Sequence, residues 1–100
     1  MKRIIYKAVT CKDGFSVSIQ ASSTAYCEPR TNDAFVYSSV ELGFPSAEDD
    51  LITQYAEDPD QPCDTVYGWV PVKVVNLLLA KHGGAVSGTV PPGIILLPAT

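Results

Sequence analysis

Positive charge is scarce in this chain, which has seven Lys and Arg residues against eleven Asp and Glu residues among its 100. The formal net charge is −4 at pH 7. Proteins that bind a nucleic-acid backbone need clustered positive charge to match the phosphates. The composition therefore argues against direct nucleic-acid binding.

Cysteine and histidine are also few. The three cysteines form no CxxC pair, and His82 is the only histidine. An odd cysteine count without paired spacing favours a reduced, cytoplasmic protein over a disulfide scaffold. Three cysteines and one histidine would make four ligands, but their spacings match no zinc motif. We expect no metal, no cofactor and no catalytic residue, and hence no enzyme.

Long apolar runs are missing as well. Lys7 interrupts the first apolar run, and no cleavage site of small residues follows, so the N-terminus does not resemble a signal peptide. The apolar run at 94–97 is far too short to cross a bilayer. We therefore expect a cytoplasmic protein without a membrane segment.

What the chain does contain is a good supply of strand-forming residues. Hydrophobic residues make up 46% of the sequence, enough for one domain spanning 1–100. Residues 3–11 are typical of a strand, and Lys12-Asp13-Gly14 predicts a turn. Residues 15–21 then alternate strictly, which predicts a half-buried antiparallel strand with Phe15, Val17, Ile19 and Ala21 facing the core.

A third strand is predicted at 35–44 after a long loop. Its expected apolar face consists of Val36, Val40, Leu42 and Phe44. Ser46 as N-cap, followed by acids, predicts a helix over 46–57, and a second helix is predicted over 71–82. A short final strand is expected at 94–97. The sequence thus predicts an α+β domain: a small three- to four-stranded antiparallel sheet with two helices packed on one face.

The loop over 22–33 is the first candidate site, because long connections in small domains are often functional. Its Arg30 is able to grip an anion or stack on a ring, unless it pairs with Glu28 or Asp33. Polar side chains on the non-core sheet face would either complete a ligand site or form an ordinary solvent-exposed surface. The expected ligand-binding residues are Arg30, Tyr26, Cys27, Asn32, Ser18, Gln20, Ser22, Tyr37 and Glu41.

An acidic segment is the second candidate. Seven of the eleven acids lie in 48–64, with no Lys or Arg among them. Such a run is either a solvated surface or a patch that meets a basic partner. Tyr67 and Trp69 follow it and are either interface anchors or core residues. The expected partner-binding residues are Glu48, Asp49, Asp50, Glu57, Asp58, Asp60, Tyr67 and Trp69.

Four stretches together resemble small proteins carried by phages and prophages. They are VSIQAS (17–22), YCEPR (26–30), VELGFPS (40–46) and TVYGWVPVKVVNLLLAKHGG (65–84). The resemblance covers about half the chain and implies an accessory phage gene product acting in the host cytoplasm. Small acidic phage proteins often antagonise host defence. No binding residue is implied, because none is defined for the group.

We therefore expect a non-enzymatic phage-type binding protein that antagonises host defence. Its partner would be either an anionic nucleotide immune signal, which it sequesters, or a defence complex such as a CRISPR effector, which it blocks. A minor virion structural or assembly factor is the alternative. The nearly all-apolar second helix makes a homo-oligomer plausible.

Overall fold

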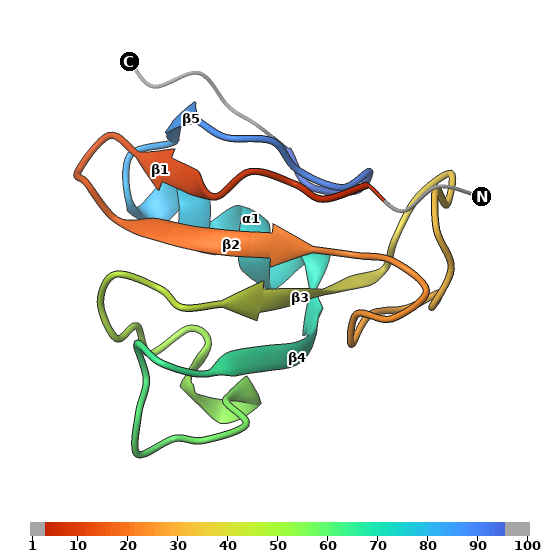
Figure 1. The fold of residues 1–100 in the computed structure, drawn as a ribbon. Helices are drawn as coiled ribbons and strands as arrows, with labels where there is room; N and C mark the ends of the chain where they lie inside the picture. The colour runs from red at the N-terminus through yellow and green to blue at the C-terminus, as the bar shows by residue number, and fades with distance from the viewer. Residues whose placement is uncertain (1–3, 96–100) are drawn as a thin grey trace.

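The computed structural model describes residues 4–95, which form a five-stranded antiparallel sheet and one α-helix (Figure 1). The strands are β1 (Val9–Cys11), β2 (Ser16–Gln20), β3 (Ser39–Gly43), β4 (Val66–Pro71) and β5 (Ala85–Ser87). They are hydrogen-bonded in the order β4-β3-β2-β1-β5. The helix α1 (Val72–Lys81) lies behind the sheet in Figure 1, and a 3-10 turn, η1 (Thr53–Tyr55), lies in the β3–β4 connection.

The hairpin of β1 and β2 confirms the most regular part of the sequence pattern. Gly14 takes the predicted turn position with φ of 96°, and the Asp13 carboxylate accepts a hydrogen bond from the backbone N–H of Phe15. The four residues predicted to face the core between 15 and 21 are all buried. Strict alternation over this strand therefore predicted its faces correctly.

The strands predicted at 3–11 and 35–44 are longer than β1 and β3, which take their places. Residues 4–8 lie outside the ladder, and there the backbone N–H of Tyr6 donates to the Gln20 side chain. The strand predicted at 35–44 shortens to β3, in which Val40 and Leu42 are buried as expected. Val36 and Phe44, assigned to the same face, are exposed.

The helix predicted over 46–57 is wrong, and η1 is its only helical remnant. The Ser46 hydroxyl accepts a hydrogen bond from the backbone N–H of Ser16 in β2, and so does not cap a helix. The Asp49 carboxylate accepts the N–H of Leu51, two residues on. Short polar side chains that bond nearby backbone in this way compete with helix formation. Acidic residues after a potential N-cap are therefore as compatible with a non-helical turn as with the first turn of a helix.

The helix predicted over 71–82 is confirmed as α1, and Gly83 and Gly84 follow it with positive φ. It buries Val75, Leu78 and Leu79. Strand β5 was not predicted. Ile94 and Ile95 form no strand, and the rest of the strand expected at 94–97 lies outside the described residues. No helix within residues 4–95 is long and apolar enough to cross a membrane.

A β-bulge interrupts β4. Val40 pairs with Val70 and Leu42 pairs with Tyr67, so two residues of β4, Gly68 and Trp69, oppose the single residue between them on β3. Tyr67 and Val70 are three apart and would face opposite sides of a regular strand. Because the bulge adds one residue, both are buried. The Trp69 side chain is thereby placed on the face of the strand away from the core.

The α+β class with an antiparallel sheet is confirmed, and the finer architecture is corrected. The sheet has five strands where three or four were expected, and one α-helix lies on it where two were expected.

Candidate functional site

An open hollow lies where the loop after β2 meets the bulge of β4. Its volume is about 370 Å³, and it is lined by Tyr26, Tyr55, Glu57, Gly68 and Trp69. We call it the aromatic hollow, because three of its five lining residues carry aromatic rings. Its volume is at the lower end of the range for small-ligand sites.

The β4 bulge presents Trp69 to this hollow. Trp69 has φ of 51°, and its backbone N–H donates to the carbonyl oxygen of Tyr26 at 2.9 Å. The two rings stack with centroids 5.0 Å apart and planes at 24°. Trp69 is nevertheless 49% exposed and Tyr26 38% exposed. Positive φ is rare for a bulky residue, and such strain is concentrated at functional sites.

Arg30 extends the same aromatic row. Its guanidinium carbon lies 5.7 Å from the centroid of the Tyr26 ring, and one of its N–H groups donates to the carbonyl oxygen of Thr24. Within the described part of the chain, neither Glu28 nor Asp33 forms an ion pair with it. The loop therefore brings Arg30 and Tyr26 together as expected, with Trp69 added from β4.

The acidic segment divides into two groups. Glu57, Asp58 and Asp60 are exposed beside the start of β4, where Glu57 and Asp58 are held by hydrogen bonds from their backbone N–H groups to Val66 and Thr65. Glu48 and Asp50 are also exposed, within the preceding turns. These side chains form no ion pair among residues 4–95.

Asp49 differs from its neighbours, because it is buried. Its carboxylate contacts Lys81 at 3.0 Å and His82 at 2.8 Å. Burial acts to raise the pKa of Asp49, but hydrogen bonds from the backbone N–H of Leu51 and from these two side chains outweigh it, so the pKa is lowered. This carboxylate therefore stabilises the fold and is not presented to a partner.

His82 joins this interaction to the β1–β2 turn. Its other ring nitrogen lies 2.7 Å from the Asp13 carboxylate, and its ring stacks on Phe15 at 4.0 Å. Burial acts to lower the pKa of His82, but the two carboxylates outweigh it and raise the pKa. The sequence placed His82 at the end of the helix predicted over 71–82 but did not indicate these contacts, which we call the Asp13–His82–Asp49 latch. With both ring nitrogens engaged, His82 has no free nitrogen to act as a general base.

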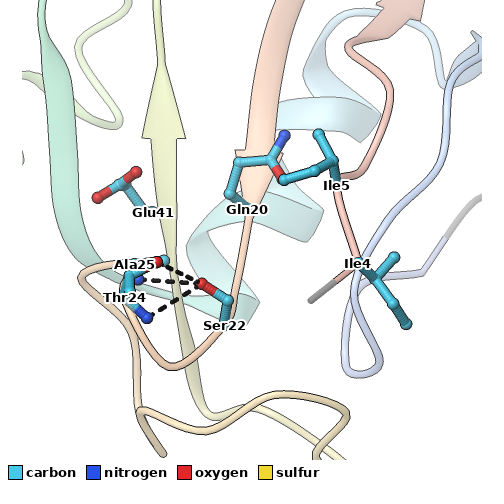
Figure 2. A pocket seen from close by; sticks show the side chains of 7 residues that line it. All are labelled: Ile4, Ile5, Gln20, Ser22, Thr24, Ala25 and Glu41. Carbon is cyan, nitrogen blue, oxygen red and sulfur yellow. Dashed lines mark hydrogen bonds between the residues drawn. The ribbon is translucent and has the colours of Figure 1, made fainter. Parts of the chain in front are cut away.

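The polar sheet face is less accessible than expected. A second hollow of about 240 Å³, shown in Figure 2, is lined by Ile4, Ile5, Gln20, Ser22, Thr24, Ala25 and Glu41. Ser22 is buried and accepts the backbone N–H groups of Thr24 and Ala25. The Gln20 amide donates to Tyr6 and to Ser18. Among residues 4–95, Glu41 is the one charged residue in the lining of this hollow.

Two further residues of the predicted ligand site are buried. The hydroxyl of Tyr37 donates to the carbonyl oxygen of Thr31, which contradicts its expected place on the open sheet face. The Cys27 thiol donates to Ser22 and Pro29 carbonyl oxygens. Burial raises the pKa of Cys27, so its nucleophilic thiolate is disfavoured.

The remaining predicted site residues also have structural roles. Tyr67 is buried, and its hydroxyl donates to the carbonyl oxygen of Pro62, so it is a core residue. Asn32 accepts the backbone N–H of Ser23, which braces the 22–33 loop. The Glu41 carboxylate accepts the backbone N–H of Tyr26 and so anchors the backbone that carries this ring.

Within residues 4–95, no three Cys, His, Asp or Glu side chains are arranged to hold a metal ion. No protein-family model, curated protein or solved structure matches this chain.

Proposed function

We propose that this protein is a non-enzymatic phage-type binding protein that antagonises host defence by docking onto a basic surface of a defence complex, such as a CRISPR effector. The observation that carries the proposal is the half-exposed Trp69, stacked on Tyr26 in a hollow that Glu57 also lines. The exposed acids Asp58 and Asp60 follow Glu57 in the same segment. Interfaces typically combine an aromatic anchor with a polar rim. Acidic rims select basic partners and speed their encounter.

Charge reversal on this rim tests the proposal. Host cells carrying one defence system each would express the protein, and the plaquing efficiency of a susceptible phage would be measured. We expect plaquing to be restored in one such host, and to be lost when Glu57 and Asp60 are both changed to Lys. Capture of that defence complex by the purified protein should weaken in parallel.

A matched variant separates the rim from net charge. Changing Glu28 and Asp50 to Lys makes the same two reversals at exposed positions outside the aromatic hollow. It also brings the formal net charge from −4 to zero, because each reversal adds two positive charges. We expect this variant to retain activity. An equal loss in both variants, or co-purification with virions and indifference to both, would contradict docking through this rim.

Sequestration of a nucleotide immune signal is the second candidate function. The row of Arg30, Tyr26 and Trp69 favours it, because aromatic rings stack on bases and a guanidinium grips phosphate. Thermal unfolding against cyclic and linear nucleotides tests it. A ligand at a hundred times its dissociation constant stabilises the folded state by about 2.7 kcal/mol. An unchanged melting temperature across the panel would leave protein docking as the function.

A further inference from the structure

We propose that the aromatic hollow is the receptor for an arginine side chain of the partner, an inference that rests on the proposed docking function. Its three rings come from segments that are distant in the sequence: Tyr26 from the loop after β2, Tyr55 from η1, and Trp69 from the β4 bulge. Glu57 adds a carboxylate to the same lining. Several rings with one carboxylate form the chemical environment that a guanidinium or ammonium cation prefers.

The rings supply the attraction over their faces. A cation over an aromatic face is attracted by the ring quadrupole, most strongly over tryptophan. The protein already uses this interaction, since the Arg30 guanidinium lies over the Tyr26 ring. A planar guanidinium also stacks on rings, which a lysine ammonium does not do. Arginine is therefore the cation that this lining fits best.

Glu57 determines the sign of the charge that the hollow accepts. Its backbone N–H donates to Val66, so the segment that carries its carboxylate is fixed against β4. Within the described part of the chain, no Lys or Arg lines the hollow. A phosphate in the hollow would therefore be repelled by the Glu57 carboxylate, whereas a guanidinium would form charge-assisted hydrogen bonds with it. The neighbouring acids Asp58 and Asp60 extend the same preference outward.

The positions of the walls are set by contacts that do not need a ligand. The Trp69 N–H bond to Tyr26 links two of the three aromatic segments. Gly68 allows their close approach, because a Cβ at this position would lie 3.3 Å from the Tyr26 Cβ. Ala56 forms a bridge with Tyr67, which holds η1 beside β4. A preformed site loses less entropy when its ligand binds.

Nuclear magnetic resonance titration with N-acetyl-arginine amide tests this proposal. Trp69 is the only tryptophan, so the single indole N–H signal reports on the hollow directly. We expect saturable shifts of this signal with a dissociation constant in the millimolar range. N-acetyl-citrulline amide, which has the same shape without the charge, should bind at least about fivefold more weakly.

Two variants separate charge within the hollow from charge elsewhere. Glu57→Gln should weaken N-acetyl-arginine amide binding roughly fivefold, while Asp50→Asn, at an exposed acid outside the hollow, should leave it unchanged. Equal binding of the arginine and citrulline amides would overturn the proposal. Shifts with adenosine but not with arginine would assign the hollow to a nucleobase and also overturn it.

The outcome is independent of the test of the proposed function. Capture of a defence complex without any response to N-acetyl-arginine amide would keep the docking function and refute the arginine receptor. A selective response to arginine, with no defence system relieved in any host, would support the receptor and refute the proposed function.

Discussion

Trp69 holds a backbone conformation that bulky residues seldom adopt, and it does so while half of its side chain remains in solvent. Its indole loses little water and contributes little burial energy, apart from the stack on Tyr26. A residue selected for stability alone would be glycine or asparagine at this φ. The combination of strain and exposure therefore supports our proposal that the indole contacts another molecule.

Two substitutions at this position separate the backbone from the ring. Both Trp69→Ala and Trp69→Gly remove the indole, and we expect Trp69→Gly to be the more stable by about 1 kcal/mol, because glycine adopts positive φ without strain. In a regular strand the order is reversed. Urea unfolding of the two variants measures the difference. If alanine proved more stable, Trp69 would not be strained and the main argument for its function would fail.

At the scale of elements, sequence patterns predicted those helices and strands whose formation depends on local alternation or periodicity. The alternation over 15–21 and the apolar run of α1 were sufficient, because one face of each is buried. The helix prediction that rested on the acidic run at 48–50 failed. Besides its local hydrogen bond, Asp49 interacts with Lys81 and His82, which are more than 30 residues away in the sequence. The sequence indicated Tyr26 and Trp69 as candidate residues of two separate sites. It did not predict that they form one hollow, because no local pattern indicated the bulge that brings Trp69 to Tyr26.

Strand β5 depends on a close approach that sequence patterns do not reveal. Gly88 follows β5 with φ of 109°, and a Cβ there would lie 2.5 Å from the Ala8 carbonyl oxygen and 2.6 Å from the Val9 Cα. Gly14 has a similar φ of 96° but open space around it. The two glycines therefore provide a matched pair, because only one of them combines positive φ with a steric clash.

We expect Gly14→Ala to cost about 1–2 kcal/mol of unfolding free energy through backbone strain. Gly88→Ala should cost at least about 2 kcal/mol more, because the clashing atoms belong to backbone and cannot rotate away. Chemical denaturation of both variants measures these losses. Hydrogen exchange should also show faster opening of β5 in Gly88→Ala alone. Equal losses in the two variants would contradict this account, because they would mean that β1 and β5 can move apart at little energetic cost.

At the scale of the whole molecule, the Asp13–His82–Asp49 latch joins three parts of the fold. Asp13 lies in the β1–β2 turn, Asp49 in the β3–β4 connection, and His82 at the end of α1. The pKa of Asp13 is lowered, first by the hydrogen bond from the Phe15 backbone N–H and then by His82. All three groups thus have pKa values shifted toward their charged forms, which links folding to pH.

The sign of each shift defines the window of greatest stability. The raised pKa of His82 adds stability that is complete below its ordinary value of 6.5 and is lost as pH rises through the folded-state pKa. The lowered pKa values of the two Asp residues add stability above their ordinary value of 3.8, which is lost as pH falls through their folded-state pKa values. The latch is therefore strongest between about pH 4 and 6.5.

We expect the melting temperature to decrease as the pH is raised above this window, and His82→Gln to remove most of that decrease. Because His82 is the only histidine, no other imidazole contributes to it. The variant itself should be less stable at pH 5.5, since Asp49 remains buried with only Lys81 as its cationic partner. Thermal unfolding across this pH range measures both effects. A wild-type melting temperature that rises from pH 6 to 8, or a variant with an unchanged pH profile, would show that His82 does not link the three segments through its charge.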